Sequence, residues 1–415
     1  MRGGVALDGP TESPRHLRVL VGLQRLAIGG MEINAIDLAG ALRQRGHDIL
    51  LFAEREDDQS LLAVARDRGV EIELLEPQGP HIRRLARALN RVVRQFDPDL
   101  VHAYGRWPTW AAFLGPHLTQ GVPLLSTCYS MTVPSWGPRS PRLIVGTQQI
   151  AAVTSSWYRG PLHVLEPPVD PEANQATSVD CGDFVHAHGL DPSHRRIVIV
   201  SRLVHDMKLE GIELAIDAVE WLGEPDVDLV IVGKGDAEDA IRRRAEAVNR
   251  RLGRAAVVLT GALIDPRPAY AAADLVLGQG GSAMRAMSFS KPLIVIGEKG
   301  FSLPFLESTK EVFFEQGLWG MGSGGVLPDV LGAQIRCLLD DAEARRGAAA
   351  FGREMAVTRY GLPQTAGRLE DICREAMKQR PALARGLVEA SRILTKNWAA
   401  RTLSPKNRRM AVAVP

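Results

Sequence analysis

Residues Gly278 to Val295 read "GQGGSAMRAMSFSKPLIV", a glycine-rich loop followed by a helix of small residues and a buried strand. This order of elements is typical of the carboxyl edge of an open α/β sheet, where ligands bind. Glycines there leave backbone N–H groups free to meet an anion, and Ser282 is the expected N-cap of the helix. We therefore expect Gly280, Gly281 and Ser282 to form an anion-binding turn.

The alternation of strand and helix begins at Leu17. Apolar runs such as "LRVLVGL" and "HDILLFA" flank the helical pattern "MEINAIDLAGALRQRG", and the strands are too apolar to face water on either side. After a proline-rich polar stretch from Glu166 to Phe184, a second series begins with "RRIVIVSRL". The sequence predicts an α/β fold of two doubly wound, Rossmann-like domains in tandem that face each other across a cleft.

The same patterns set the expected boundaries. We predict a disordered tail over residues 1–16, the two domains over 17–170 and 171–360, a terminal helix over 361–380 and a basic tail over 381–415.

Composition excludes several classes of protein. The 415 residues carry a formal net charge of +2, so no global field draws the chain to nucleic acid, and no nucleic-acid partner is expected. The four cysteines form no Cys-x-x-Cys pair, which argues against a zinc site or a disulfide framework and fits a reducing cytoplasm. With no apolar leader and no run of about 18 apolar residues, we expect neither export by a signal peptide nor a membrane span.

The segment from Pro381 onward is strongly basic. Glu389 is its single acid, against seven basic residues: Arg385, Arg392, Lys396, Arg401, Lys406, Arg408 and Arg409. Apolar residues fall near helical spacing, which is typical of a basic amphipathic helix on an anionic membrane, here peripheral at the inner membrane surface. A terminal helix strapped across the domains, followed by a disordered basic end, fits the pattern equally well.

Two further loops are suited to anions. Gly29 and Gly30 follow the first strand and precede a helix, where glycine lets a phosphate approach the backbone. Arg202 and Lys208 follow the first strand of the second series, and two cations at that edge suit a diphosphate. The alternatives are a tight turn for the glycines and a solvated loop for the cations.

Taken together, these motifs resemble the family 4 glycosyltransferases of the GT-B fold over most of residues 17–377. The resemblance rests on "GGMEINAIDLAGALRQRGHDILLFA", "DPDLVHAYG", "SRLVHDMKLEGIELAIDAV", "LVIVGKGD" and "ADLVLGQGGSAMRAMSFSKPLIV" in the family's order and spacing. It implies an N-terminal acceptor domain and a C-terminal domain for a nucleotide-diphosphate sugar. It also implies transfer with retention at the anomeric carbon, without a metal or another cofactor.

The resemblance assigns roles to single residues. Gly29, Gly30, Gly233 and the Gly280–Ser282 turn are expected around the donor, and Arg202 and Lys208 are expected to neutralise the leaving diphosphate.

The sugar-contacting positions depart from the family pattern. Arg285 stands where the second of two glutamates is usual, the first glutamate is missing, and Glu298 on the same sheet edge is a candidate replacement. Arg285 is expected to grip the diphosphate, donate to hydroxyls or meet an additional anion on the donor; the alternative is a structural pair with an acid. Tyr129 stands where the family usually has a histidine that touches the transferred sugar, and Tyr129 and His102 are candidate catalytic residues beside Arg202 and Lys208. His102 is retained, either as a ligand contact or as a buried strand-end histidine bonded to backbone.

The leading functional hypothesis is therefore sugar transfer from a nucleotide-diphosphate sugar to a small-molecule, glycan or lipid-linked acceptor. The altered positions leave open a non-catalytic nucleotide-binding partner subunit of another transferase. The loop from Cys128 to Pro141 is expected on the acceptor side, where Trp136, Arg139 and Arg142 suit a sugar ring or an anion.

Overall fold

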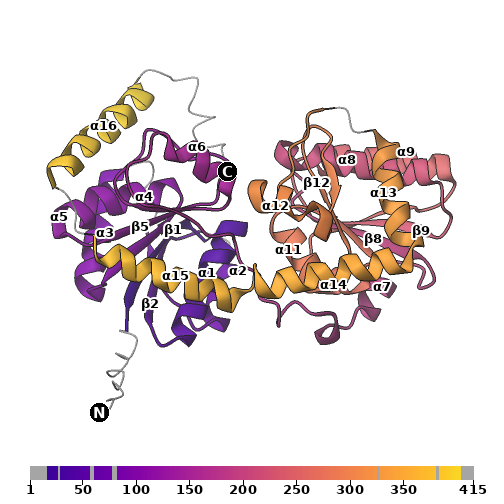
Figure 1. Ribbon diagram of the computed structural model, residues 1–415, viewed down its shortest axis with the longest axis horizontal. Helices are drawn as coiled ribbons and strands as arrows, with labels where there is room; N and C mark the ends of the chain where they lie inside the picture. Colours follow the sequence, from indigo (N-terminus) through magenta and orange to yellow (C-terminus); the bar gives the residue numbers. More distant parts are fainter. Residues whose placement is uncertain are drawn as a thin grey trace, which may run out of the picture.

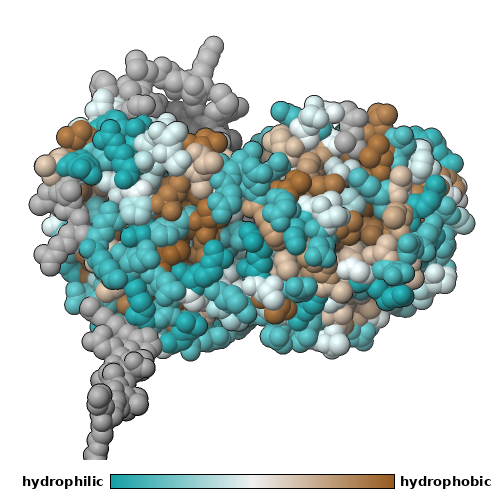
Figure 2. Space-filling model, in the orientation of Figure 1, coloured by the Kyte–Doolittle hydropathy of each residue, from teal (hydrophilic) through white to brown (hydrophobic). Residues whose placement is uncertain are grey.

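Two α/β domains lie side by side in the computed structural model (Figure 1). The structure describes residues 16–26, 29–56, 60–76, 82–324, 327–379 and 383–402. The predicted disordered tail over 1–16 lies outside these ranges except for His16, as does the end of the basic tail from residue 403. Figure 2 shows the surface narrowing between the two lobes.

The N-terminal domain is built on a seven-stranded parallel sheet in the order β3-β2-β1-β4-β5-β6-β7. Its strands are β1 (Arg18–Arg25), β2 (Asp48–Glu54), β3 (Glu71–Leu75), β4 (Leu100–Tyr104), β5 (Leu124–Cys128), β6 (Arg142–Val145) and β7 (Leu162–Val164). Its helices are α1 (Gly30–Gln44), α2 (Ser60–Asp67), α3 (Ile82–Phe96), α4 (Arg106–Ala112), η1 (Phe113–His117), α5 (Leu118–Gln120) and α6 (Gln148–Ser155). The strand order reverses at β1 and β4, so a ligand crevice is expected at their carboxyl ends.

The C-terminal domain repeats the plan with a six-stranded sheet in the order β10-β9-β8-β11-β12-β13, where only β13 is antiparallel among the described strands. Its strands are β8 (Arg195–Val200), β9 (Val227–Val232), β10 (Val257–Gly261), β11 (Leu275–Gly278), β12 (Leu293–Ile296) and β13 (Ser302–Pro304). Its helices are η2 (Ala176–Ser178), α7 (Gly182–Ala187), α8 (His205–Leu222), α9 (Glu238–Leu252), α10 (Arg267–Ala272), α11 (Gly281–Ser288), η3 (Glu307–Thr309), α12 (Lys310–Gln316), α13 (Pro328–Asp340) and α14 (Ala342–Thr358).

The chain crosses between the domains twice. After α14 it returns as α15 (Leu362–Met377), which buries Leu369 and Cys373 in the same core as β1 and α1 (Figure 1). The two crossings are tied together, because the Val169 N–H donates to the Tyr360 carbonyl and the Leu362 N–H donates to the Val169 carbonyl, both at 2.8 Å. The N-terminal domain is therefore assembled from two separate stretches of chain.

The last described helix, α16 (Leu383–Thr402), also lies on the N-terminal domain. It buries Ala390 and Ile393 in the core beneath α3 and α4. Its described side-chain contacts are with the N-terminal domain alone, so α16 is a docked terminal helix but does not strap the two domains together as the alternative prediction had it. Across the described ranges, no helix is long and apolar enough to cross a membrane.

Candidate active site

The loop between β8 and α8 brings Arg202 and Lys208 to the carboxyl edge of the C-terminal sheet. Met207 has a positive φ of 64°, so the regular part of α8 begins at Lys208. That uncommon conformation is held on both sides, because the Met207 N–H donates to Oε1 of Glu298 at 3.2 Å and its carbonyl accepts from Nε2 of Gln279 at 2.7 Å. Three loops of the edge are thereby fixed to one another.

Lys208 lies beside a second cation in a partly buried setting. Burial, and then the charge of Arg202, lower the pKa of Lys208 to about 8, while the Glu298 carboxylate acts in the opposite direction. Its Nζ also lies 5.3 Å from the ring centroid of Trp319. A bound anion would relieve the repulsion between the two cations.

The Gly280 turn enters α11 beside these groups. Gly280 is the N-cap, with a φ of 58°, and a Cβ there would lie 3.1 Å from Trp319, so a side chain is disfavoured. The prediction that Ser282 is the N-cap is wrong, because Ser282 lies inside the helix and its hydroxyl bonds to that of Tyr270 at 3.0 Å. Gly281 is exposed and has open space at its Cβ position.

Arg285 projects from α11 toward the domain boundary. Its charge opposes the rise that burial causes in the pKa of Tyr270, and it acts on Asp265 and, across the boundary, on Asp37 of α1. It forms no ion pair within 4.0 Å with a described carboxylate, so the structural pair left open by the sequence is not observed. Asp37 instead pairs with Arg68 at 2.9 Å.

The N-terminal domain contributes the start of α1. Gly29 is its N-cap in an extended conformation, and a Cβ at Gly30 would meet no described atom within 4 Å. Open space at Gly30 leaves room for a ligand to approach the backbone.

Glu32, in the first turn of α1, was not identified from the sequence. Burial raises the pKa of its carboxyl, and the nearby charges of Arg25 and Arg202 oppose that shift, so Glu32 faces Arg202 across the domain boundary. The sequence feature that could have identified Glu32 is its position in the first turn of the helix, shortly after Gly29 and Gly30.

His102 and Tyr129 lie in the interior of the N-terminal domain. His102 is 1% exposed, with Nε2 2.7 Å from Oγ1 of Thr127, and burial lowers its pKa to about 3, so the ring is neutral. Of the two predicted alternatives, His102 is therefore the buried strand-end histidine. Its hydrogen-bond partner is the Thr127 hydroxyl rather than the backbone. The Tyr129 hydroxyl is buried without a described partner, and burial raises its pKa. Contrary to the expectation of catalytic contact, neither polar group is exposed to a ligand.

Two other predicted positions serve the protein's own packing. A Cβ at Gly233 would lie 1.8 Å from the Ser201 carbonyl, which explains the glycine by the close approach of two strand ends. Arg142 pairs with Glu375 at 2.9 Å and so ties β6 to α15. Its guanidinium is engaged by that contact rather than turned toward an acceptor.

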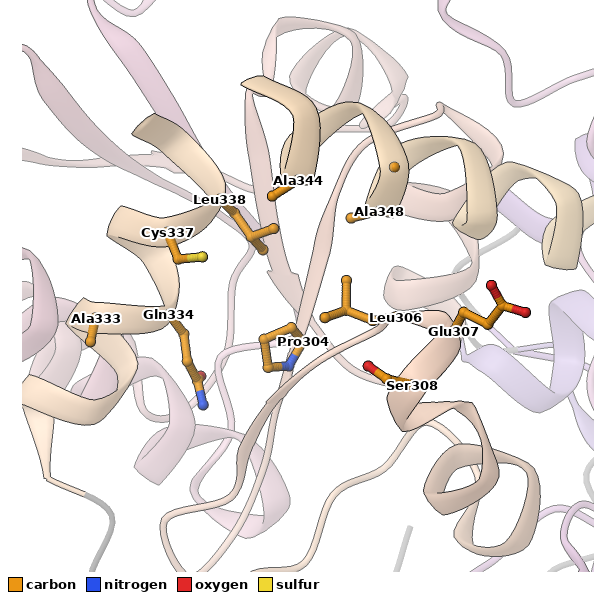
Figure 3. A pocket seen from close by; sticks show the side chains of 11 residues that line it. Pro304, Leu306, Glu307, Ser308, Ala333, Gln334, Cys337, Leu338, Ala344 and Ala348 are labelled. Carbon is orange, nitrogen blue, oxygen red and sulfur yellow. The ribbon is translucent and has the colours of Figure 1, made fainter. Parts of the chain in front are cut away.

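A separate groove of about 810 Å³ lies on the C-terminal domain (Figure 3). Its mostly apolar walls come from β13, the start of η3, α13 and α14 and include Leu306, Cys337, Leu338 and Ala348. None of the predicted site residues lines it, and its walls hold no cation. In the parts of the chain that the structure describes, no group of three or more His, Cys, Asp or Glu residues is placed to hold a metal ion.

Both halves of the chain match family models. The model of Glycosyltransferase Family 4 matches residues 28–173, and that of Glycosyl transferases group 1 matches residues 194–307. The chain belongs to the family 4 glycosyltransferases. The matches support a glycosyltransferase enzyme, the leading hypothesis from the sequence.

Relatives of this glycosyltransferase share its length and fold. It is 23% identical over 410 residues to a D-inositol 3-phosphate glycosyltransferase of Xylanimonas cellulosilytica, covering 85% of this chain and 93% of the other. A glycosyltransferase structure from Rickettsia africae superposes with a TM-score of 0.70 at 14% sequence identity. The match covers 88% of this chain and 99% of the Rickettsia chain. The structure of Anabaena HepE in complex with UDP and glucose superposes with a TM-score of 0.67 at 18% sequence identity. The match covers 87% of this chain and 100% of HepE. The predicted GT-B fold is confirmed.

Proposed function

We propose that this glycosyltransferase uses a nucleotide-diphosphate sugar and holds the diphosphate between Arg202, Lys208 and the Gly280 turn. The observation that carries the proposal is the convergence of two cations that form no ion pair with any described carboxylate. They lie at the carboxyl edge of the sheet, where ligands of such folds bind. The solved complex of HepE with UDP and glucose supports the same class of donor.

The chemistry follows from charge. When the bond from the anomeric carbon to the diphosphate breaks, negative charge grows on the leaving oxygen, and prearranged cations stabilise it. Arg202 and Lys208 would supply this stabilisation without a metal, with retention at the anomeric carbon. Glu298 already accepts the Met207 N–H and has a second carboxylate oxygen for a sugar hydroxyl.

The acceptor is proposed to bind against the N-terminal domain, as a small molecule, a glycan or a lipid-linked sugar. Trp136, in the loop after β5, packs edge-on to Trp110 and lies beside the Arg106 guanidinium. Aromatic faces and an arginine suit a sugar that carries an anionic group. The name of the Xylanimonas relative supports a phosphorylated hydroxyl compound as one such acceptor.

Peripheral contact with an anionic membrane is a further part of the proposal. α16 exposes Arg385 beside Leu387 and Val388, and α3 contains no acid. The exposed arginines of α3 are Arg83, Arg84, Arg87, Arg91 and Arg94. Basic and apolar side chains together favour the surface of an anionic bilayer.

A thermal-shift screen against nucleoside diphosphates tests the donor proposal. A ligand at 100 times its Kd stabilises the folded state by about 2.7 kcal/mol, which raises Tm measurably. The expected hit should then support turnover of its sugar conjugate by the purified protein. Absence of a shift with every nucleoside diphosphate would remove the proposal.

A further inference from the structure

A second concentration of positive charge lies far from the donor site. A pocket of about 530 Å³ between α16 and the N-terminal domain is lined by four arginines, Arg139, Arg159, Arg385 and Arg392, together with Glu389 and Val388. Arg139 precedes β6 and Arg159 precedes β7, so both lie at the amino edge of the parallel sheet, opposite the edge that carries the donor site. Figure 1 shows α16 on the part of the N-terminal domain that is remote from the C-terminal domain.

The single carboxylate of this arginine pocket is bonded through one of its oxygens to the loop that carries Arg139, while its other oxygen is buried without a described partner. Glu389 is 6% exposed, and its Oε2 accepts from the N–H of Arg139 at 2.9 Å and from the N–H and hydroxyl of Ser140 at 3.3 and 3.0 Å. These bonds fix α16 to the loop. None of the four guanidinium groups forms an ion pair within 4.0 Å with a carboxylate of the described chain. The pocket therefore holds four positive charges against one negative charge.

Two of the arginines are held in place before any ligand arrives. Arg139 donates from Nε and Nη2 to the Ser135 carbonyl at 3.0 and 2.7 Å and stacks over Trp157. Arg392 donates from Nη2 to the Gly137 carbonyl at 2.9 Å. Burial and then the charge of Arg139 lower the pKa of Arg392, the Glu389 carboxylate opposes them, and Arg159 adds to the lowering. Like charges fixed at close range repel one another, and a bound anion would relieve this repulsion.

We propose that the arginine pocket binds a phosphate group, presented by the headgroup of an anionic membrane lipid. Guanidinium forks match phosphate oxygens in geometry and charge. The rim argues for a lipid, because Val388 lines the pocket at 70% exposed and Leu387 beside it is 64% exposed. Apolar side chains next to a phosphate site suit a molecule that carries both a phosphate and acyl chains. The assignment of the phosphate to a membrane lipid rests on the proposed membrane contact. The proposal that the pocket binds a phosphate group is independent of that contact.

The test uses the full chain and two matched double variants. Arg159→Gln with Arg385→Gln removes two exposed charges of the pocket whose guanidinium groups form no hydrogen bond within the described chain, so the fold should be preserved. Arg243→Gln with Arg250→Gln removes two exposed charges from α9 of the C-terminal domain. Each is measured for binding to phosphatidylglycerol vesicles, with phosphatidylcholine vesicles as background, and for binding of glycerol 1-phosphate in solution.

We expect the pocket variant to weaken both interactions by about tenfold and the α9 variant to change them less than twofold. Leu387→Ser with Val388→Ser should weaken vesicle binding alone. If only glycerol 1-phosphate binding depends on the pocket, a soluble phosphate ester is the source and the lipid assignment is overturned. If both double variants lose binding equally, or wild-type protein binds neither probe, the phosphate site itself is overturned. If the wild-type protein binds glycerol 1-phosphate but not the vesicles, the proposed membrane contact is overturned and the phosphate site stands.

Discussion

The carboxyl edges of the two sheets are built on different principles. At the C-terminal edge, Arg202, Lys208 and Glu298 remain partly or fully exposed and act on one another through charge. At the N-terminal edge, the polar groups of His102 and Tyr129 are buried beneath the surface. Substitutions at the first edge should therefore change anion affinity, whereas substitutions at the second should change stability.

The largest effect is expected at the C-terminal edge. Arg202→Ala combined with Lys208→Ala should weaken binding of a nucleoside diphosphate by at least about 100-fold, because each cation forms charge-assisted contacts worth about 1.5–3 kcal/mol. Isothermal titration calorimetry with UDP gives the affinity, and thermal unfolding checks the fold. Affinity unchanged in the double variant would mean that the diphosphate binds elsewhere.

A smaller loss is expected at Arg285. Arg285→Glu should reduce UDP affinity by about tenfold and more than Arg285→Ala, because a carboxylate adds repulsion to the lost donors. The new acid would also lie near Asp37 and Asp265, which now feel the arginine's charge. Measuring both variants under identical conditions separates the two costs. Tighter binding by Arg285→Glu would show that this position serves a ribose hydroxyl as an acceptor.

The titration of Lys208 predicts a modest dependence on pH. Its pKa of about 8 leaves the ammonium charged below that value and neutral above it, so UDP affinity should fall a few-fold as pH rises through 8. The Lys208→Arg variant keeps its charge over this range and controls for titration of the ligand. Equal pH profiles for the two proteins would place the titrating group elsewhere.

The smallest effect on donor binding is expected at the N-terminal edge. His102→Leu should leave UDP affinity unchanged but lower the free energy of unfolding by about 1–3 kcal/mol, because the buried Thr127 hydroxyl loses its partner. Urea unfolding and calorimetry provide the two readouts. A loss of UDP affinity without a loss of stability would contradict a structural role for His102. The carboxyl edges of both sheets would then contribute to donor binding.

The architecture was predictable from the sequence because apolar strands and amphipathic helices alternate with a clear period. The grouping of Arg202, Lys208 and Glu298 was also predictable, since each follows a strand that ends at one edge. Side-chain burial was harder to predict. His102 fits either a ligand contact or a core bond, and only the position of Thr127 on the neighbouring strand distinguishes them.

Contacts between distant segments were beyond the sequence patterns. The helix over 361–380 was expected as a terminal helix, but nothing in its own residues indicates that α15 completes the core of the N-terminal domain. Glu389 looked like a lone acid in a basic tail, and its partners at Arg139 and Ser140 are remote in sequence. Ser282 is a favourable N-cap by residue type, yet the positive φ of Gly280 places the start of α11 earlier.

The double crossing at Val169 and Leu362 also governs how the protein can be divided. A fragment that ends at the first crossing would lack α15, so the apolar face of α1 that meets Leu369 and Cys373 would be open to water. Such a fragment should self-associate. Supplying residues 362–402 as a separate peptide, which restores α15 and also the α16 residues Ala390 and Ile393, should restore a monomer. During synthesis, the N-terminal domain therefore waits for the C-terminal domain to leave the ribosome before its own core can close.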